Sequence, residues 1–416
     1  MFEQFVKRPL ALARHRTGPL REERLAYLDH LAGLGMSRKT VFECAHYLLA
    51  IADFLRLADR PGETISHDEI EQNAALWAER QRKPPYRKGG RSSRETFLRH
   101  ATRWLRFQGR LAQRPVRISP YTGMIAAFAD FMRIERGLSP ATIRGRCWFV
   151  QRFLDRLDTN DGSLSTITIN QIDATLLGML THGGYSRYSV QTWTSELRAF
   201  FRFAEMRSWC HSGLATAIQS PRVYSLSSLP VGPSWDDVRR LLATTTGDRP
   251  VDVRDRAILM LLAIYGLRAG EVTRLRLEDF DWEHESFSVT TSKTRKARAY
   301  PLSRPVGDAI LRYLKEVRPR SAHREVFLSL HAPIRPLLVL WPIVGPRLRS
   351  LGVLTAQLGP HALRHACASH LLAQGLSLKE IGDHLGHQDP DATRIYAKVD
   401  LVGLHQVADF DLGGLL

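Results

Sequence analysis

Residues 361–396, HALRHACASHLLAQGLSLKEIGDHLGHQDPDATRIY, decide how the C-terminal part of the chain is expected to fold. Gly375 is placed to end one helix, and the capping box SLKE at 377–380 begins the next. Gly386 then ends this second helix and leaves His387 at its C-terminal edge. The stretch therefore predicts short helices that are joined by tight turns.

A third helix is predicted to carry Tyr396, the last residue of this stretch. Asp389 is a suitable N-cap, Pro390 suits the first helical position, and the tyrosine follows about two turns later. On the first helix His361 and Arg364 are three residues apart, so both side chains project from one face. The pattern thus predicts two histidines, an arginine and a tyrosine on closely linked helices.

Two further motifs lie upstream of this stretch. Arg268, in the motif GLRAGE, directly follows a strongly apolar helix predicted over 253–265, so its guanidinium can be held rigidly. Alternating residues at 286–290 and the return at 299–302 predict a β-hairpin with Lys293 in its turn. This part of the chain is therefore predicted to be mainly α-helical with a small β-hairpin or sheet.

These side chains form the set that a metal-free attack on a DNA phosphodiester needs. Arg268 and Arg364 can each offer a planar fork of donors to the non-bridging phosphate oxygens. Tyr396 must lose its proton to attack, and a site lined with cations favours the phenolate. Lys293 can protonate the leaving 5′-oxygen. The two histidines can hydrogen-bond the phosphate or relay a proton, and the sequence leaves that division open.

Composition agrees with a nucleic-acid partner. The 416 residues include 59 Lys and Arg against 42 Asp and Glu, a formal net charge of +17, which favours polyanions. The length suits two or three domains. Four scattered cysteines with no CxxC pair are typical of reduced thiols in a cytosolic protein. No apolar run is long enough for a membrane span or a signal peptide, so we expect a soluble cytoplasmic protein.

The positive charge is concentrated between Arg80 and Arg117, where thirteen Arg and Lys residues face one acid, Glu95. The first part of this segment, RQRKPPYRKGGRSS, is predicted to be an exposed loop. A helix is predicted from Ser93, with an apolar face and a stripe of arginines formed by Arg99, Arg103, Arg106 and Arg110. Because no acids balance this stripe, we expect it to contact DNA phosphates. A solvated helix face is the alternative.

The front half of the chain repeats itself. Residues 36–57 parallel residues 138–158, each with a serine N-cap, a threonine, an aromatic residue midway and a closing Phe-Leu. Two all-helical modules are therefore expected, although chance similarity of amphipathic helices is the alternative. A stretch rich in Pro, Gly and Ser follows, which suits a linker. The expected domains are an N-terminal module at 1–117, a second helical module at 118–220, a linker at 221–233 and a catalytic domain at 234–416.

The C-terminal motifs resemble those of the tyrosine recombinase, or phage integrase, family of DNA strand transferases. The family pattern is an arginine in a GLRxxE turn, a lysine in a β-hairpin, HxxR, LGH, and a tyrosine nine residues after that histidine. This pattern is met in full over about 234–412, and the helical module at about 120–207 resembles the family more loosely. The resemblance implies a catalytic set of Arg268, Lys293, His361, Arg364, His387 and the nucleophile Tyr396, with Glu271 in support.

The resemblance also implies what the chain does. It would cleave and rejoin double-stranded DNA through a covalent 3′-phosphotyrosyl intermediate, with no metal, cofactor or ATP. It would act as a homo- or hetero-tetramer on two paired sites in the bacterial cytoplasm, with no membrane partner. Arg295, Lys296 and Arg298, near the hairpin lysine, are interpreted as contacts to the DNA backbone or solvated turn charges, and Arg295 and Lys296 are the two taken as DNA-binding. The N-terminal module departs from the family because a minimal member does not need it.

Other functions stay open. A non-catalytic DNA-binding partner could keep this fold within the synaptic complex of a mobile element, and a topoisomerase would share the nucleophile. A metallohydrolase could draw its ligands from His361, His365, Asp383, His384 and His387. The zinc-protease helix, however, needs Glu where Ala362 stands. His365, His370 and His384 are therefore interpreted as packing or supporting residues.

Overall fold

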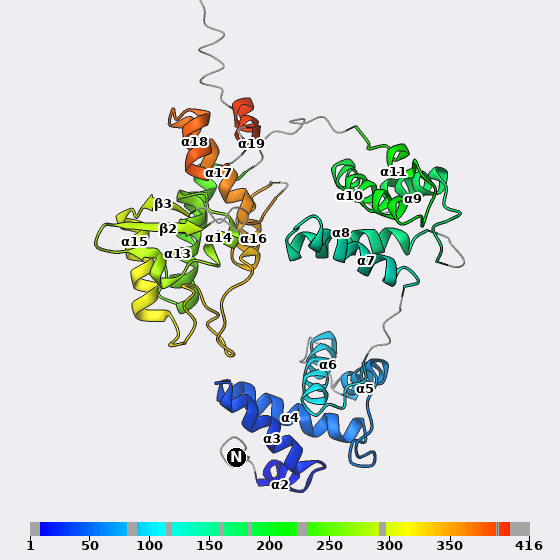
Figure 1. Cartoon of the computed structure of the whole chain (residues 1–416). Helices are drawn as coiled ribbons and strands as arrows, with labels where there is room; N and C mark the ends of the chain where they lie inside the picture. The colour runs from blue at the N-terminus through cyan, green and yellow to red at the C-terminus, as the bar shows by residue number, and fades with distance from the viewer. Residues whose placement is uncertain are drawn as a thin grey trace, which may run out of the picture. The chain divides into compact units, whose positions relative to one another are not determined.

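The computed structural model is mainly α-helical with one small sheet, as predicted (Figure 1). Contacts divide the chain into two compact units, Met1–Ala112 with Ser228–Leu416, and Gln113–Ser227. In the part of the chain that the structure describes, no helix is long and apolar enough to cross a membrane. The described residues are 9–80, 90–113, 119–157, 162–181, 185–222, 232–290, 297–355, 357–387, 389 and 391–399.

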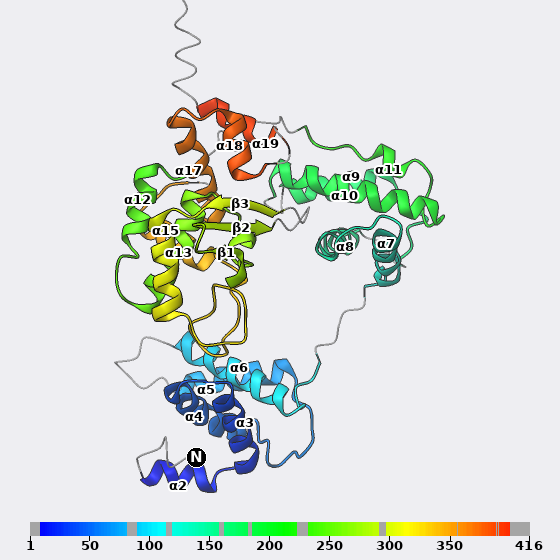
Figure 2. The same cartoon turned by 60° about the vertical axis from the view of Figure 1, so that its left-hand side comes forward.

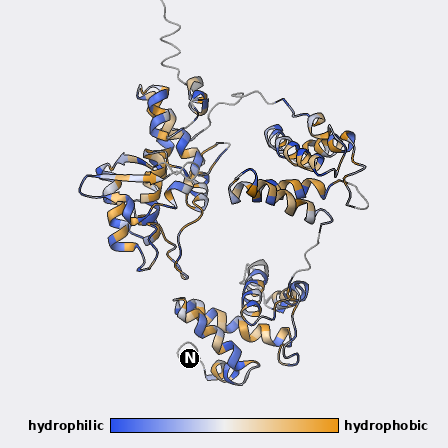
Figure 3. Ribbon diagram, viewed as in Figure 1, coloured by the Kyte–Doolittle hydropathy of each residue, from blue (hydrophilic) through white to orange (hydrophobic). Residues whose placement is uncertain are grey.

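The N-terminal helices pack around a core of their own. They are α2 (Pro9–Thr17), α3 (Arg21–Gly33), α4 (Arg38–Phe54), α5 (His67–Arg80) and α6 (Gly90–Phe107). The predicted apolar face of α6 is buried, with Phe97, Trp104 and Leu105 fully covered. Hydrophobic and hydrophilic residues share each of these helices (Figure 3). Helices α4, α5 and α6 bury their apolar side chains and expose most of their charged ones, so these three are amphipathic, and tertiary packing stabilises them.

Residues 113–227 hold a second helical core. Its helices are α7 (Thr122–Ile134), α8 (Pro140–Leu154), α9 (Ile169–Thr181), α10 (Arg187–Met206) and the short α11 (Leu214–Ala217). The predicted aromatic face of α10 is buried here, since Phe200, Phe201 and Phe203 are almost wholly covered. Trp193 stacks on Phe149 of α8, with ring centroids 4.6 Å apart. Aromatic packing thus joins α8 to α10.

The repeat in the sequence corresponds to a repeat in local structure. Ser37 caps α4 by accepting the N–H of Thr40 at 3.2 Å. Ser139 caps α8 in the same way, accepting the N–H of Thr142 at 3.2 Å. The same pair of residue types thus begins the helix of each parallel segment, which supports the prediction of two related modules. The predicted domain boundaries remain proposals.

The C-terminal part is built around α13 (Pro250–Ile264), most of whose side chains are buried. Other helices surround it, and Figure 2 shows the strands beside it in the order β1, β2, β3. The helices are α12 (Trp235–Ala243), α14 (Ala269–Val272), α15 (Arg304–Arg312), α16 (Trp341–Ser350), α17 (Pro360–Ala373), α18 (Leu378–Leu385) and α19 (Asp391–Arg394), with shorter turns η1 (Leu277–Asp279), η2 (Tyr313–Val317) and η3 (Ile395–Val399).

The sheet contains the predicted hairpin. Strands β2 (Ser286–Thr290) and β3 (Ala297–Pro301) pair antiparallel, with Phe287 opposite Tyr300. A two-residue strand, β1 (Phe280–Asp281), adds to the other edge of β2 and was not predicted. The turn between β2 and β3 would carry Lys293, Arg295 and Lys296, and all three lie outside the described residues.

Two helix predictions are wrong in detail. Helix α6 ends at Phe107, and Gly109 follows with a φ of +69°, so Arg110 does not continue the helical stripe. Tyr396 lies in the 3₁₀ turn η3, after the single turn of α19. Asp389 does cap this segment, because its side chain accepts the N–H of Asp391 at 2.9 Å. Pro390 lies outside the described residues.

Candidate active site

Arg268 is held by Glu271 at the turn that follows α13. Arg268 donates its backbone N–H to Glu271 Oε2 at 2.8 Å and its Nη1 to Oε1 at 3.1 Å. The Glu271 side chain is only 3% exposed, whereas that of Arg268 is 45% exposed. The buried carboxylate thus fixes the backbone and one edge of the guanidinium, and leaves the other donors of Arg268 able to face a ligand.

The approach of α18 to this turn requires a glycine. Gly266 has a φ of +59°, which favours glycine, and a Cβ at this position would overlap the side chain of Leu385. The end of α18 therefore reaches the turn that carries Arg268.

Arg298 is a second guanidinium on the same carboxylate. Its Nη2 donates to Glu271 Oε1 at 3.1 Å, and its side chain is 19% exposed. The guanidinium lies over the ring of Tyr300, 5.5 Å from the centroid. A Cβ on Gly386 would overlap Arg298 Nη1, so the left-handed turn before His387 packs directly against this arginine. Arg298 therefore links β3, α14 and the end of α18.

The interpretation of Arg298 as a solvated turn charge is therefore wrong. Its Nε and Nη1 are buried and have no hydrogen-bond partner among the described residues. The sequence could have indicated this burial. Arg298 is two residues before the buried Tyr300 in β3, so both side chains point to the same face of the strand.

Arg364, on α17, joins the two motifs that flank the site. Its Nη1 donates to the carbonyl of Gly266 at 2.6 Å, and its Nη2 donates to the carbonyl of Leu385 at 2.8 Å. The side chain is 2% exposed. Burial, followed by the nearby charge of Arg268, lowers the pKa of Arg364 to about 10. The residue is still a cation at neutral pH, and it fixes the turn of Arg268 against the turn of His387.

The positive charges of Arg364 and Arg268 act on both predicted catalytic histidines. Burial, then Arg364 and Arg268, lowers the pKa of His387 to about 4. The same three causes, in the same order, lower the pKa of His361. His387 Nδ1 lies 2.6 Å from Thr393 Oγ1, which orients its ring. Both imidazoles are therefore neutral at pH 7, and each can donate its one N–H to an anion.

Tyr396 is buried at the edge of this cluster, with 2% of its surface exposed. Its hydroxyl lies 2.9 Å from Nδ1 of His365. Burial raises the pKa of Tyr396 to about 12, although Arg364 acts in the opposite direction. The expectation that surrounding cations favour the phenolate is therefore wrong for this conformation, because burial among apolar side chains outweighs them. Tyr396 belongs to an apolar cluster with Cys367, Ala368, Leu372, Ile381 and Leu385.

The histidines do not form a metal-binding cluster. Within the described ranges, no group of three or more His, Cys, Asp or Glu side chains is placed to hold a metal ion. His384 Nε2 lies 3.4 Å from the carbonyl of Ile264, so its ring packs against the end of α13. His370 stacks on Trp235, with ring centroids 3.8 Å apart. These two histidines therefore pack and support the fold, as interpreted from the sequence.

The arginine stripe of α6 is only partly available to a ligand. Arg99, Arg103 and Arg106 are exposed on the side of the helix opposite its buried face. Arg110 instead donates to the backbone carbonyls of Glu63 and Arg60, at 3.0 and 2.5 Å. The guanidinium of Arg110 therefore fastens the loop after α4, and three arginines remain as candidates for DNA contact.

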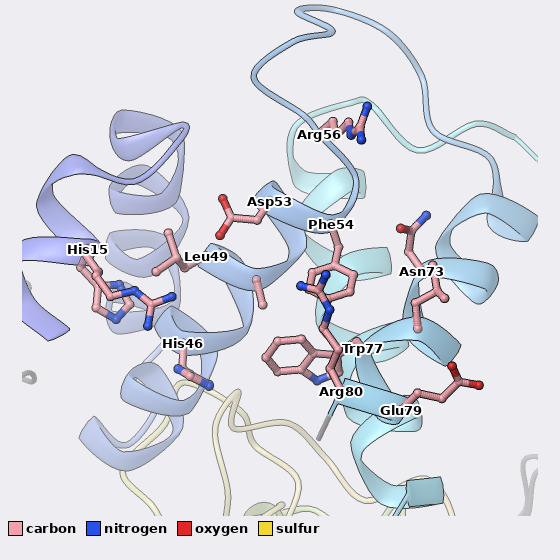
Figure 4. Close-up of a pocket in the computed structure, with 13 residues that line it drawn as sticks. His15, His46, Leu49, Asp53, Phe54, Arg56, Asn73, Trp77, Glu79 and Arg80 are labelled. Atoms are coloured by element: carbon pink, nitrogen blue, oxygen red, sulfur yellow. The ribbon is translucent and has the colours of Figure 1, made fainter. Parts of the chain in front are cut away.

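A separate hollow of about 940 Å³ lies among α2, α4 and α5. Figure 4 shows Phe54 and Trp77 in its wall, with His15 and His46 on the other side. Arg80 lies over the ring of Phe54, 5.0 Å from the centroid. Of the predicted catalytic and DNA-binding residues that the structure describes, none lines this hollow.

Comparisons with known proteins match most of the chain. The sequence model of the phage integrase family matches residues 234–401, and that of the phage integrase N-terminal SAM-like domain matches residues 125–208. The proposed integrase/recombinase y4rA of Sinorhizobium fredii is 32% identical over 97% of both chains. Tyrosine recombinase XerD of Listeria monocytogenes is 30% identical and covers 68% of this chain and 96% of its own.

The fold also matches a solved structure. The XerH site-specific recombinase, solved with palindromic difH substrate as a post-cleavage complex, superposes with a TM-score of 0.53. The match covers 82% of this chain and 96% of that chain at 17% identity. At this identity the likeness concerns the fold.

Proposed function

The chain belongs to the phage integrase family of tyrosine-type site-specific DNA recombinases, and we propose that it works through a covalent 3′-phosphotyrosyl intermediate. One observation carries the proposal above all: buried Arg364 bonds both the Gly266 and the Leu385 carbonyls. Arg364 thereby joins the turn that carries Arg268 to the turn that precedes His387, and Tyr396 packs with Leu385 in the adjoining apolar cluster. A phosphate between the two arginines would meet fixed positive charge on two sides.

The proposed reaction needs no metal or ATP. Arg268 and Arg364 neutralise the non-bridging oxygens, whose charge increases in the transition state. Tyr396 Oη attacks phosphorus as the bond to the 5′-oxygen breaks, and Lys293 supplies the proton for that oxygen. The phosphotyrosyl ester keeps the energy of the broken bond, so a 5′-hydroxyl from a second strand can reverse the attack. Neutral His361 and His387 donate hydrogen bonds to the phosphate.

The proposed substrate is double-stranded DNA at two paired sites, held by a homo- or hetero-tetramer. The similarly folded XerH recombinase, which is bound to a difH substrate in its crystal structure, supports the DNA substrate. The tetramer on two sites is proposed from the family to which the chain belongs. Positive charge on the exposed face of α6 supports a further backbone contact by Arg99, Arg103 and Arg106. We propose that Arg295 and Lys296 contact DNA beside the scissile phosphate.

A trapping experiment tests the function. Nicked suicide duplexes, tiled across the DNA that flanks the gene, lose the short 5′-hydroxyl fragment after cleavage and so retain the covalent adduct. We expect an adduct with the wild-type chain and none with Tyr396→Phe, which should still bind the same duplex. A wild-type chain that binds a duplex tightly and never forms an adduct would favour a non-catalytic DNA-binding partner instead.

A further inference from the structure

We infer that His365 is a further catalytic residue, which holds the hydroxyl of Tyr396 and takes its proton as the tyrosine attacks. The inference rests on the proposed function and deepens it, because no described member of the predicted catalytic set hydrogen-bonds to the nucleophile. His365 Nδ1 lies 2.9 Å from Tyr396 Oη, within hydrogen-bond distance. Their rings are 5.8 Å apart at 57°, so the imidazole meets the phenol at its polar end.

The other two histidines of the site are directed elsewhere. His387 Nδ1 is occupied by Thr393 Oγ1 at 2.6 Å. The ring of His361 meets the ring of His365 edge to face, with centroids 4.6 Å apart. Among the described residues, His365 is the hydrogen-bond partner that the structure gives to Tyr396. The contacts therefore differ: His387 bonds Thr393, His361 packs edge to face on His365, and His365 holds the nucleophile.

The position of the His365 ring is fixed by packing. Gly232, just before α12, lies so close to α17 that a Cβ there would stand 3.0 Å from His365 Cβ and 2.9 Å from Ala366 N. On the other side the ring contacts His361 and Tyr396. A base that is held in this way needs little rearrangement when the reaction begins.

The charge state of the pair sets the direction of the hydrogen bond. Burial, then His361 and Arg364 on the same helix, lowers the pKa of His365 to about 4. Burial raises the pKa of Tyr396 to about 12, with Arg364 opposing the rise and Cys367 adding to it. At pH 7 the imidazole is therefore neutral and the phenol keeps its proton. With the ring proton on Nε2, Tyr396 donates to Nδ1 of His365.

A bound phosphate changes this balance in the direction that cleavage needs. Its negative charge beside Arg364 offsets the positive charge that lowers the pKa of His365, so the imidazole becomes a better acceptor. Tyr396 Oη then bonds to phosphorus, the proton of the tyrosine hydroxyl passes to His365 Nδ1, and the P–O5′ bond breaks. The leaving oxygen takes a proton from Lys293. In religation each proton returns, and the imidazolium reprotonates the departing tyrosine.

Adduct kinetics test this role. His365→Gln keeps a polar side chain that can hydrogen-bond to Tyr396 but cannot take up its proton. On the suicide duplexes described above, we expect single-turnover adduct formation to slow about 10²- to 10⁴-fold, the usual loss when a general base is removed. The adduct rate of His365→Gln should also rise about tenfold for each pH unit above neutrality, because hydroxide must then take the tyrosine proton in place of the histidine. His370→Gln is the matched control, since it changes the same residue type on α17 outside the site.

An equal adduct rate and pH profile for His365→Gln and wild type would overturn the inference while leaving the proposed function intact. If the wild type forms no adduct on any duplex, the proposed function fails. A measurement without DNA can then still test whether Tyr396 donates a hydrogen bond to His365. Histidine ¹⁵N spectra of the full chain should show the Nε2–H tautomer at His365, with an Nδ1 shift that changes in Tyr396→Phe. A proton on Nδ1, or spectra that Tyr396→Phe does not alter, would rule out the proposed acceptor.

Discussion

Replacing Glu271 with Gln should loosen the site more than any exposed substitution in the same part of the chain. The buried carboxylate accepts three hydrogen bonds, from the backbone and Nη1 of Arg268 and from Nη2 of Arg298. Glutamine keeps the shape of the side chain and one acceptor oxygen, but it removes the negative charge between two guanidiniums. One of its amide N–H groups would then face a donor.

The magnitude follows from how far each arginine is buried. Arg298 is 19% exposed, and leaving a buried charge without its partner costs about 3–5 kcal/mol. Arg268 is 45% exposed, so solvent limits its share to about 1 kcal/mol or less. The retained amide oxygen offsets part of this loss, so we expect a net destabilisation of about 2–4 kcal/mol.

Calorimetry of the full chain measures this loss. For a domain of this size, the Tm of the catalytic part should fall by about 5–10 °C, and adduct formation should slow about 10²-fold as Arg268 loses its support. Glu278→Gln is the matched control, because Glu278 also pairs with two arginines but is 45% exposed. A Glu271→Gln variant with the melting profile and adduct rate of wild type would refute the reasoning.

Other perturbations give equally specific results. Gly386→Ala should destabilise the catalytic part by about 1–3 kcal/mol in calorimetry, because its φ is +66° and its new methyl group would displace Arg298. The free energy of unfolding should fall as the pH drops from about 6.5 through about 4. The reason is that His365 and His387 have lowered pKa values in the folded chain, so the folded state favours their neutral rings. A free energy of unfolding that stays constant over this pH range would contradict this. Adduct formation should survive excess EDTA, and activity restored only by zinc or magnesium would point to a metal site. Arg99, Arg103 and Arg106 should be replaced together with Gln. Each lost phosphate contact should reduce the slope of log K against log salt concentration by about 0.9, so the triple variant should lose about two to three units of slope. An unchanged slope would indicate that these arginines form a solvated helix face.

Local rules were enough to predict the hairpin and the start and end of α18, but not the 3₁₀ turn that carries Tyr396. Ser377 and Glu380 form the predicted capping box, with the Ser377 N–H donating to Glu380 Oε2 at 2.8 Å. Gly386 adopts the left-handed conformation that its place after α18 predicted, and β2 pairs with β3 as a hairpin. These features depend on residues that are close in the sequence, so a short motif contains most of the information.

What the local patterns missed are mainly contacts between distant residues. Arg298 meets Glu271 across 27 positions, and His365 meets Tyr396 across 31 positions, so no local pattern specifies either pair. The direction of the Tyr396 pKa shift also depends on tertiary burial, which outweighs the nearby positive charge. Arg110 was misplaced for a simpler reason, because the helix stops before Gly109 and the arginine turns back to the carbonyls of a preceding loop.

The identity of the residue that becomes attached to DNA tests the central claim most directly. The trapped adduct can be digested with protease and nuclease and its nucleotide-bearing peptide sequenced by mass spectrometry. The proposed mechanism predicts a nucleotide linked through its 3′-phosphate to the oxygen of Tyr396. Attachment through a 5′-phosphate, or at any other side chain, would contradict it.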